Sequence, residues 1–561
     1  MSDYLCAMST TDHISADRLI RTWVACGLTH AVVSPGSRNA PLILALSSHP
    51  SLEVVVALDE RSAAHLALGM GIQSGRPALV VSTSGTAAVN HGPAIAEAFY
   101  QEVPLISVTA DRPSRNRNWG LGQSAMQTGM FDAHTRWSCE VTEFQKDIHD
   151  LDEIARTAWG KSQQGPVHIN ISFDEPLYGQ NEFVKGTGPV SEPLIFQMPE
   201  TQQMPDDLQD IVCQHDPRIL LHIGPVALGP SLSTEVDALI ERCAVVADVF
   251  GAHGSGAESS TMRWMCGWDR QADEQWIPDA IVTVGLPPMD KRFRSLIVDW
   301  GVPHWHLGHE ENDWNMFGSK VGQWRMDAKN GLNELADALP AFNGYAQRWE
   351  VRRIQLEAAD MRSRNDEWVD FNVYRWLAEH LPKAGRIHFA NSTSARYAQW
   401  FQWNASRLCA NRGVAGIDGC LSTAVGDALM DSDTPVVAIV GDAAWLYDLN
   451  GWHVNPRPNN LKIIVINNGG GNIFRWLKGP ADSGLLERFF ESGFATNVRG
   501  TAEQLALPYF LIDGWDSMET GFQSWANNSG SCLLEIQTPG EASANHVRNH
   551  CDTMGEWLRD S

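Results

Sequence analysis

Gly441-Asp442 ends the apolar run from Pro435 to Val440, and Asn467-Asn468-Gly469-Gly470 ends a second, from Leu461 to Ile466. Both runs are short, rich in β-branched residues and bounded by turn-forming residues, which indicates buried parallel strands. Because the carboxyl ends of parallel strands meet at one edge of a sheet, the polar groups after both runs face one crevice. The pattern predicts an α/β fold with a ligand site at this edge.

Asp442 and Asn468 provide hard oxygen atoms at that edge. Mg²⁺ commonly takes one or two protein oxygens and completes its shell with water and phosphate oxygens. Taken singly, Gly-Asp and Asn-Gly are ordinary turn dipeptides. Their joint occurrence after two predicted strands favours a metal-bridged diphosphate.

The rest of the chain alternates predicted strands with helical stretches, which is typical of doubly wound, largely parallel sheets. The predicted domains are 1–185, 205–340 and 354–561, and Gly179 to Asp207 is interpreted as a linker rich in proline, glycine and polar residues. The further predicted strands are His30–Val33, Glu53–Leu58, Ala78–Ser82, Leu105–Thr109, Ile219–Ile223, Ala244–Phe250, Ala280–Val284, Ile387–Ala390 and Leu533–Ile536.

Composition excludes several classes of function. The chain has 561 residues, of which 43% are hydrophobic and 19% charged, and a formal net charge of −25. Nucleic acids and anionic membranes require a basic face, so neither is expected as a partner. The 10 cysteines form no C-x-x-C pair, which argues against a zinc site. No run reaches the roughly 18 apolar residues of a membrane span, and the polar start lacks a secretory signal, so a cytoplasmic protein is expected.

Glu60 follows the predicted strand Glu53–Leu58 and precedes a helix. A carboxylate in a first helical turn often only complements the helix dipole. If the third domain holds a metal-bound diphosphate, Glu60 can have a second role. Thiamine diphosphate needs a glutamate that hydrogen-bonds its aminopyrimidine ring and favours the imino tautomer.

With these residues, nearly the whole chain resembles the three-domain thiamine diphosphate enzymes, the family of pyruvate decarboxylase and acetohydroxyacid synthase. Within it, the chain resembles the branch that acts in menaquinone biosynthesis. The motifs that carry this closer resemblance are Ser34-Pro35-Gly36-Ser37-Arg38, Ala110-Asp111-Arg112-Pro113, Asn391-Ser392 with Arg396, and Asn411-Arg412-Gly413 through Gly416-Ile417-Asp418-Gly419.

The resemblance implies the thiamine diphosphate-binding fold, with pyrimidine, central and diphosphate domains. It also implies decarboxylation of 2-oxoglutarate and 1,4-addition of the succinyl carbanion to isochorismate. Arginine forks suit such dicarboxylates, because guanidinium groups bind carboxylates bidentately. By the same resemblance, the oxoglutarate-binding residues are Ser392, Arg396 and Arg412, and the isochorismate-binding residues are Ser37, Arg38, Arg112, Gln123, Lys291 and Arg292. Any one arginine could instead form a surface salt bridge, and Lys291 could lie in a charged loop.

The resemblance also assigns residues to the cofactor. Glu60 is the expected catalytic residue, and the expected ligands of Mg²⁺ or Mn²⁺ are Asp442, Asn468 and the Gly470 carbonyl. Ile417 is expected to wedge between the two cofactor rings, although it could be an ordinary core residue. The remaining expected cofactor contacts are Gly413, Gly441, Ala443, Ile473 and Phe474, of which Ile473 and Phe474 would form a dry apolar wall.

Two positions depart from the family pattern: Gly122 stands where asparagine is expected, and Gly469 interrupts a run of asparagines. The resemblance further implies a homodimer or homotetramer with active sites between subunits. One rival is a carboligase or decarboxylase of the same family that acts on another 2-oxo acid. Another is a non-catalytic nucleotide- or diphosphate-binding protein, but Gly413 to Gly419 lacks the dinucleotide spacing and no P-loop motif is present.

Overall fold

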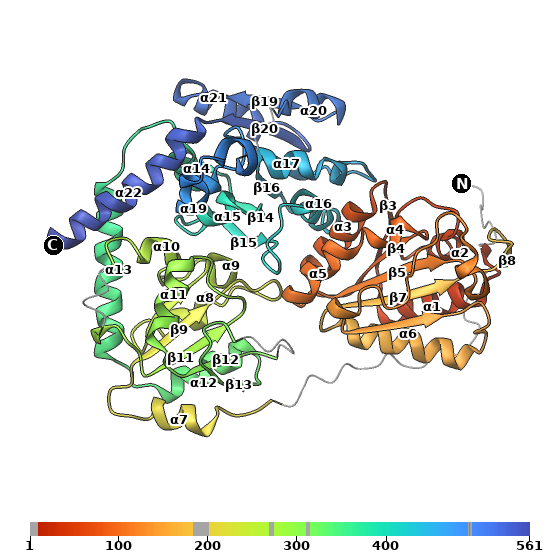
Figure 1. Ribbon diagram of the computed structural model, residues 1–561, viewed down its shortest axis with the longest axis horizontal. Coiled ribbons are helices and arrows are strands. Elements are labelled where there is room, and N and C mark those ends of the chain that lie inside the picture. Colours follow the sequence, from red (N-terminus) through yellow and green to blue (C-terminus); the bar gives the residue numbers. More distant parts are fainter. Residues whose placement is uncertain are drawn as a thin grey trace. The chain divides into compact units, whose positions relative to one another are not determined.

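The structure is a computed structural model that describes residues 9–182, 201–268, 274–309, 315–491, 493 and 496–560. The chain forms two compact units (Figure 1). The first unit takes its residues from 1–197, 413–433 and 447–461, and the second from 198–412, 434–446 and 462–561. No helix in the described ranges combines the length and apolar character needed to cross a membrane.

The first unit contains a seven-stranded sheet in the order β17-β3-β2-β4-β5-β7-β6. Its strands are β2 (His30–Val33), β3 (Glu53–Ala57), β4 (Ala78–Ser82), β5 (Leu105–Asp111), β6 (Trp137–Val141), β7 (Pro166–Ser172) and β17 (Val454–Asn455). All pair in parallel except β17, which runs antiparallel to β3. The chain passes from β2 to β3 on one side and to β4 on the other, so this sheet has a topological switch point at β2.

Helices flank this sheet and bury its apolar residues. They are α1 (Ile14–Cys26), α2 (Ala40–Ser47), α3 (Glu60–Ser74), α4 (Thr86–Val89), α5 (Gly92–Gln101), α6 (Ile148–Ser162) and α16 (Cys420–Met430). Helix α16 packs closely on α3: a Cβ on Gly426 would lie 2.0 Å from the Leu66 carbonyl oxygen, and one on Gly69 would lie 2.0 Å from that of Thr423. Glycine on both helices therefore lets the two backbones approach.

The second unit contains two parallel sheets. The five-stranded sheet has the order β10-β9-β11-β12-β13, with β9 (Ile219–Ile223), β10 (Ala244–Ala247), β11 (Ala280–Val284), β12 (His304–Leu307) and β13 (Lys320–Trp324). The six-stranded sheet has the order β15-β14-β16-β18-β20-β19, with β14 (Ala384–Phe389), β15 (Ala405–Ala410), β16 (Val436–Gly441), β18 (Leu461–Asn467), β19 (Tyr509–Ile512) and β20 (Cys532–Gln537).

The buried apolar residues of the second unit form two hydrophobic clusters, one of which contains residues of both sheets. The other elements of this unit are helices. They are α7 (Asp206–Val212), α8 (Ser233–Asp237), α9 (Val249–Ala252), α10 (Thr261–Trp264), α11 (Lys291–Trp300), α12 (Ala328–Ala338), α13 (Gly344–Arg362), α14 (Asp370–His380), α15 (Thr393–Ala398), α17 (Asp442–Tyr447), α18 (Ile473–Trp476), α19 (Lys478–Asp482), α20 (Val498–Gln504), α21 (Trp515–Ala526) and α22 (Gly540–Asp560). In the six-stranded sheet, β15 and β16 lie on opposite sides of β14, which places a switch point there.

The predicted α/β class with doubly wound parallel sheets is confirmed, and the predicted strands coincide with observed ones to within a few residues. The run Ala244–Phe250 differs, because β10 ends at Ala247 and the Asp248 side chain accepts the Phe250 N–H to begin α9. The predicted linker also differs at its ends: β8 (Gln180–Glu182) pairs with β1 (Ser9–Thr11), and α7 begins at Asp206. Most of the linker lies outside the described residues, and the three predicted domains stay a prediction.

Candidate active site

Asp442 joins the ends of two neighbouring strands in the six-stranded sheet. It follows β16, is 2% exposed, and accepts hydrogen bonds from the backbone N–H groups of Ala443 (2.8 Å) and Gly469 (3.0 Å), the latter just after β18. Burial raises the pKa of Asp442 to about 6, against the effect of these hydrogen bonds. A buried carboxylate with this much unfavourable desolvation is stabilised in its charged form by a cation.

Asn468 is oriented by a residue that sequence reasoning missed. Its Nδ2 donates to Asp370 Oδ2 at 2.8 Å, and its buried Oδ1 has no hydrogen-bond partner. Asp370 is fully buried, and its carboxylate also accepts a hydrogen bond from the Thr538 hydroxyl. Because Asp370 accepts only, it selects the amide orientation that leaves the Asn468 oxygen for another ligand. No motif signals Asp370, which looks in the sequence like an ordinary acid in a first helical turn.

The turn after Asn468 depends on glycine. Gly470 has φ +141°, and a Cβ there would lie 2.4 Å from the Glu491 carbonyl oxygen. The Gly470 carbonyl accepts the Asn472 N–H at 2.8 Å, which leaves a second lone pair for a metal. Next come Ile473 and Phe474 in α18, both partly exposed. The Phe474 ring is tilted by 48° against that of Phe490, with the ring centroids 5.8 Å apart.

These residues fit a metal-bound diphosphate. Asp442, the unpartnered Asn468 Oδ1 and the Gly470 carbonyl are hard oxygen donors of the kind that Mg²⁺ or Mn²⁺ prefers. A Cβ on Gly441 would meet nothing within 4 Å, so space lies beside the strand end. Helix α17 begins at Asp442.

Glu60 is the first residue of α3, directly after β3. The preceding Asp59 caps the helix by accepting the Arg61 N–H (2.9 Å) and the Ser62 N–H (3.3 Å). Burial raises the pKa of Glu60, and a hydrogen bond from the Asn90 side chain opposes the rise. A raised pKa favours the protonated carboxyl, which can donate to a ring nitrogen. Asn90 is a further contact that the sequence did not signal.

The segment from Gly413 to Gly419 lies in the first unit with Glu60. Ala415 has φ +60° and Gly419 has φ +82°, so the loop uses left-handed conformations at both positions. Ile417 is only partly buried and is not part of the unit's hydrophobic core. Ile417 is therefore not an ordinary core residue.

Two arginines gather beside β14 in the second unit. Arg396 Nη1 donates to the Ser392 carbonyl at 2.7 Å, and Arg412 Nη1 donates to Asn391 Oδ1 at 2.6 Å. Burial and, secondly, the charge of Arg412 lower the pKa of Arg396 to about 10, while Asp290 opposes this. Ser392 has φ +71°, and such strain clusters at ligand sites. Two positively charged side chains that lie close together and are partly buried favour the binding of an anionic ligand.

Lys291 and Arg292 form the first turn of α11, not a loop. Asp290 caps this helix by accepting the Arg292 N–H, and its carboxylate also pairs with the Arg292 guanidinium at 3.0 Å. Both basic side chains are exposed. Arg292 is thus partly neutralised, and Lys291 is the freer cation for a ligand.

The first unit holds the other predicted isochorismate residues. Arg38 follows β2, donates to the Phe173 carbonyl (3.2 Å) and pairs with Glu175 (3.2 Å), and Ser37 beside it is exposed. Arg112 follows β5 and donates to the Gly122 carbonyl through Nε at 3.1 Å.

Gln123 has φ +58°, and its carbonyl accepts the Ser84 hydroxyl at 2.9 Å. Asparagine was expected at position 122, but the group of Gly122 that accepts a hydrogen bond from Arg112 is its backbone carbonyl oxygen. The backbone here orients an arginine, which requires no particular side chain at position 122.

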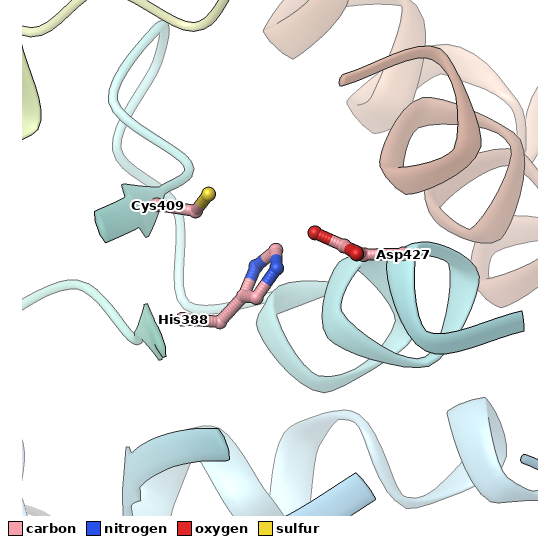
Figure 2. A group of neighbouring side chains, drawn as sticks. All are labelled: His388, Cys409 and Asp427. Carbon is pink, nitrogen blue, oxygen red and sulfur yellow. The ribbon is translucent and has the colours of Figure 1, made fainter. Parts of the chain in front are cut away.

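His388, Cys409 and Asp427 are a separate group of buried polar residues (Figure 2). His388 and Cys409 are paired positions in the adjacent strands β14 and β15. Asp427 lies on α16, in the other compact unit. Within one unit only two of these residues meet, and two residues do not make a metal site.

The candidate residues are divided between the two compact units. The first unit carries Ser37, Arg38, Glu60, Arg112, Gln123, Gly413 and Ile417, and the second carries Lys291, Arg292, Ser392, Arg396, Arg412, Gly441, Asp442, Ala443, Asn468, Gly470, Ile473 and Phe474. In both units these residues follow the carboxyl ends of parallel strands or begin helices, where α/β proteins bind ligands.

Comparison with known proteins agrees with this geometry. Residues 15–135 match the family described as the thiamine pyrophosphate enzyme N-terminal TPP-binding domain. Fold, strand-end site and this match define an enzyme of the thiamine diphosphate class.

Full-length relatives narrow the class. A protein of Flavobacterium johnsoniae is 30% identical over 93% of this chain and 96% of its own length. Those of Cytophaga hutchinsonii and Porphyromonas gingivalis are 30% and 32% identical over 91% of this chain, and over 94% and 92% of their own lengths. All are named 2-succinyl-5-enolpyruvyl-6-hydroxy-3-cyclohexene-1-carboxylate synthase. The chain belongs to this family of synthases.

Proposed function

We propose that the protein decarboxylates 2-oxoglutarate and adds the remaining four-carbon unit to isochorismate. The product is 2-succinyl-5-enolpyruvyl-6-hydroxy-3-cyclohexene-1-carboxylate, an intermediate of menaquinone biosynthesis. The observation that carries this assignment is the pair Arg396 and Arg412, whose guanidinium groups donate to the consecutive residues Ser392 and Asn391 and therefore repel each other. A dicarboxylate relieves that repulsion, whereas pyruvate offers one carboxylate only.

Thiamine diphosphate would supply the carbanion chemistry that the decarboxylation and the addition require. Glu60 would hold a proton at the aminopyrimidine ring, for which its raised pKa suits it. Asp442, Asn468 and the Gly470 carbonyl would hold Mg²⁺ or Mn²⁺, and Gly413, Gly441 and Ala443 would contact the cofactor. Ile417 would set the angle between its rings, and Ile473 with Phe474 would exclude water.

The substrates would be held by separate groups of cations. Ser392, Arg396 and Arg412 would bind the part derived from 2-oxoglutarate. Isochorismate would be bound by Ser37, Arg38, Arg112, Gln123, Lys291 and Arg292. In a chain with a net charge of −25, these local cations would provide the attraction for anionic substrates that the global field does not.

The assembly is proposed from the family resemblance. We propose a homodimer or homotetramer in which each active site takes Glu60 from one subunit and the metal ligands from another. The cytoplasmic location expected from the sequence stays a prediction.

The experiment is isochorismate consumption by metal-stripped protein, with thiamine diphosphate, Mg²⁺ and 2-oxoglutarate each supplied or withheld. Loss of isochorismate that depends on all three supports the proposal. If a 2-oxo acid loses CO₂ while isochorismate persists, the acceptor is wrong. No turnover of either substrate would favour a non-catalytic diphosphate-binding protein.

A further inference from the structure

Glu97, on α5, is a buried carboxylate that neither the motifs nor the proposed chemistry uses. It is 1% exposed. Its two oxygens accept the backbone N–H groups of Gly413 (2.6 Å) and Val414 (2.8 Å), and the Gln101 side-chain amide also donates to it. Burial raises the pKa of Glu97, and these hydrogen bonds oppose the rise. Three donors suit an ionised carboxylate, which only accepts.

The hydrogen bonds fasten one end of the loop 413–419 to α5. Glycine is required at this end, because a Cβ on Gly413 would lie 2.6 Å from the Glu97 carbonyl oxygen and 3.1 Å from its Oε1. The other end of the loop rests on α3: a Cβ on Gly419 would lie 2.1 Å from the His65 ring. The His65 ring is fixed in turn, with Nδ1 2.9 Å from the Arg61 carbonyl oxygen.

The loop is therefore held between two helices of the first unit, and one of them, α3, begins with Glu60. Ile417 lies between the two fixed ends. Moving the Gly413 end would therefore move Ile417. A displacement of about 1 Å far from the reacting atoms can cost about 100-fold in rate.

We propose that Glu97 is a positioning residue whose carboxylate fixes the loop 413–419 and so sets the position of Ile417 in the cofactor site. This inference rests on the proposed function, since that function gives Ile417 its task. Glu97 itself touches neither substrate nor cofactor.

The test variant is Glu97→Gln, which keeps the shape but points an amide N–H at a backbone N–H. The matched control is Asp152→Asn, because Asp152 is also a buried helical carboxylate of the first unit and pairs with Arg18 at 2.5 Å. Glu97→Asp is the second variant: it keeps the charge but withdraws the carboxylate by one methylene. It replaces Glu97→Gln if that protein does not fold.

The first readout is hydrogen–deuterium exchange of the peptide covering 413–419, in full-length protein without thiamine diphosphate. We expect about tenfold faster exchange in Glu97→Gln and unchanged exchange at this peptide in Asp152→Asn. The second readout is steady-state kinetics with cofactor and both substrates. We expect kcat to fall about 10- to 100-fold in Glu97→Gln, with the KM values for both substrates within about twofold of wild type.

Unchanged exchange of the loop in Glu97→Gln would overturn the proposal. So would faster exchange with a kcat no lower than that of Asp152→Asn, because the carboxylate would then hold the loop without serving the reaction. If wild-type protein turns over neither substrate, the proposed function fails, and the positioning role fails with it even if the loop loosens.

Discussion

Asp370 shows how a single buried acceptor can decide the chemistry of its neighbour. It holds the Asn468 amide nitrogen, so the amide oxygen is the atom left for a metal. Residues that orient metal ligands in this way affect metal affinity nearly as much as the ligands do.

Replacing Asp370 by Asn is expected to weaken Mg²⁺ binding about 10- to 100-fold, since an amide at position 370 can donate and let the Asn468 amide reverse. The measurement is the Mg²⁺ concentration that gives half-maximal thiamine diphosphate binding. Ser543→Ala is the matched control, because Ser543 bonds the Asp370 backbone N–H and leaves the Asn468 contact intact. Equal effects of the two substitutions would contradict the orienting role.

Asp248 predicts a dependence of stability on pH. Its oxygens accept the Phe250 N–H (2.9 Å) and the Gln399 amide (2.7 Å), and burial raises its pKa to about 7 from an ordinary value of 3.8. The folded protein thus keeps this proton after the unfolded chain has released it. The stability that the protonated carboxyl contributes is complete below the ordinary pKa and is lost as pH rises through the folded pKa.

The Tm of wild type minus that of Asp248→Asn is therefore expected to fall as pH rises from about 4 to about 7, and then to level off. Thermal unfolding of both proteins without ligands, across this range, makes the comparison. Melting curves that shift in parallel would show that Asp248 does not titrate as its burial requires.

Among the elements, the crossing of α3 and α16 places the loop 413–419 beside the helix that begins with Glu60. Glycine at Gly69 and Gly426 makes this approach possible. From the sequence, both glycines sit in helical stretches and carry no local signal, since isolated glycine in a helix usually only lowers its stability.

Gly426→Ala is expected to destabilise the first unit by about 1–3 kcal/mol, because its Cβ would overlap the Leu66 carbonyl oxygen. Gly160→Ala is the matched control, since Gly160 lies in α6 and a Cβ there meets nothing within 4 Å. That control should be neutral or stabilising by less than about 1 kcal/mol. Denaturant unfolding followed by circular dichroism measures both, and equal midpoints would refute the close crossing.

For the whole molecule, the proposed assembly predicts complementation between inactive subunits. Glu60→Gln and Asp442→Ala each remove one half of the proposed site. If sites form between two subunits, each mixed dimer contains one intact site and one site with both substitutions, so purified mixed dimers should have about half of wild-type activity. Coexpression with two different tags, followed by tandem purification and assay, measures this. Inactive mixed dimers would place each site within a single chain.

The sequence by itself determined the strands, the class of fold and the position of the candidate site along the chain. The runs before Asp442 and Asn468 are β16 and β18, respectively, because β-branched residues and turn formers act over a few residues. The position of Glu60 after a predicted strand singled it out, and the family motifs added Arg38, Arg112, Arg396 and Arg412, since these motifs are also local stretches of sequence.

Only the tertiary structure decided which groups support that site. Asp370, Asn90 and Glu97 meet partners far along the chain, and in the sequence each resembles an ordinary polar residue of a helix or turn. The same holds for β17, whose antiparallel pairing with β3 joins segments that are far apart in the sequence. Burial and hydrogen bonding between distant segments depend on how the elements pack, and no local pattern of residues records that packing.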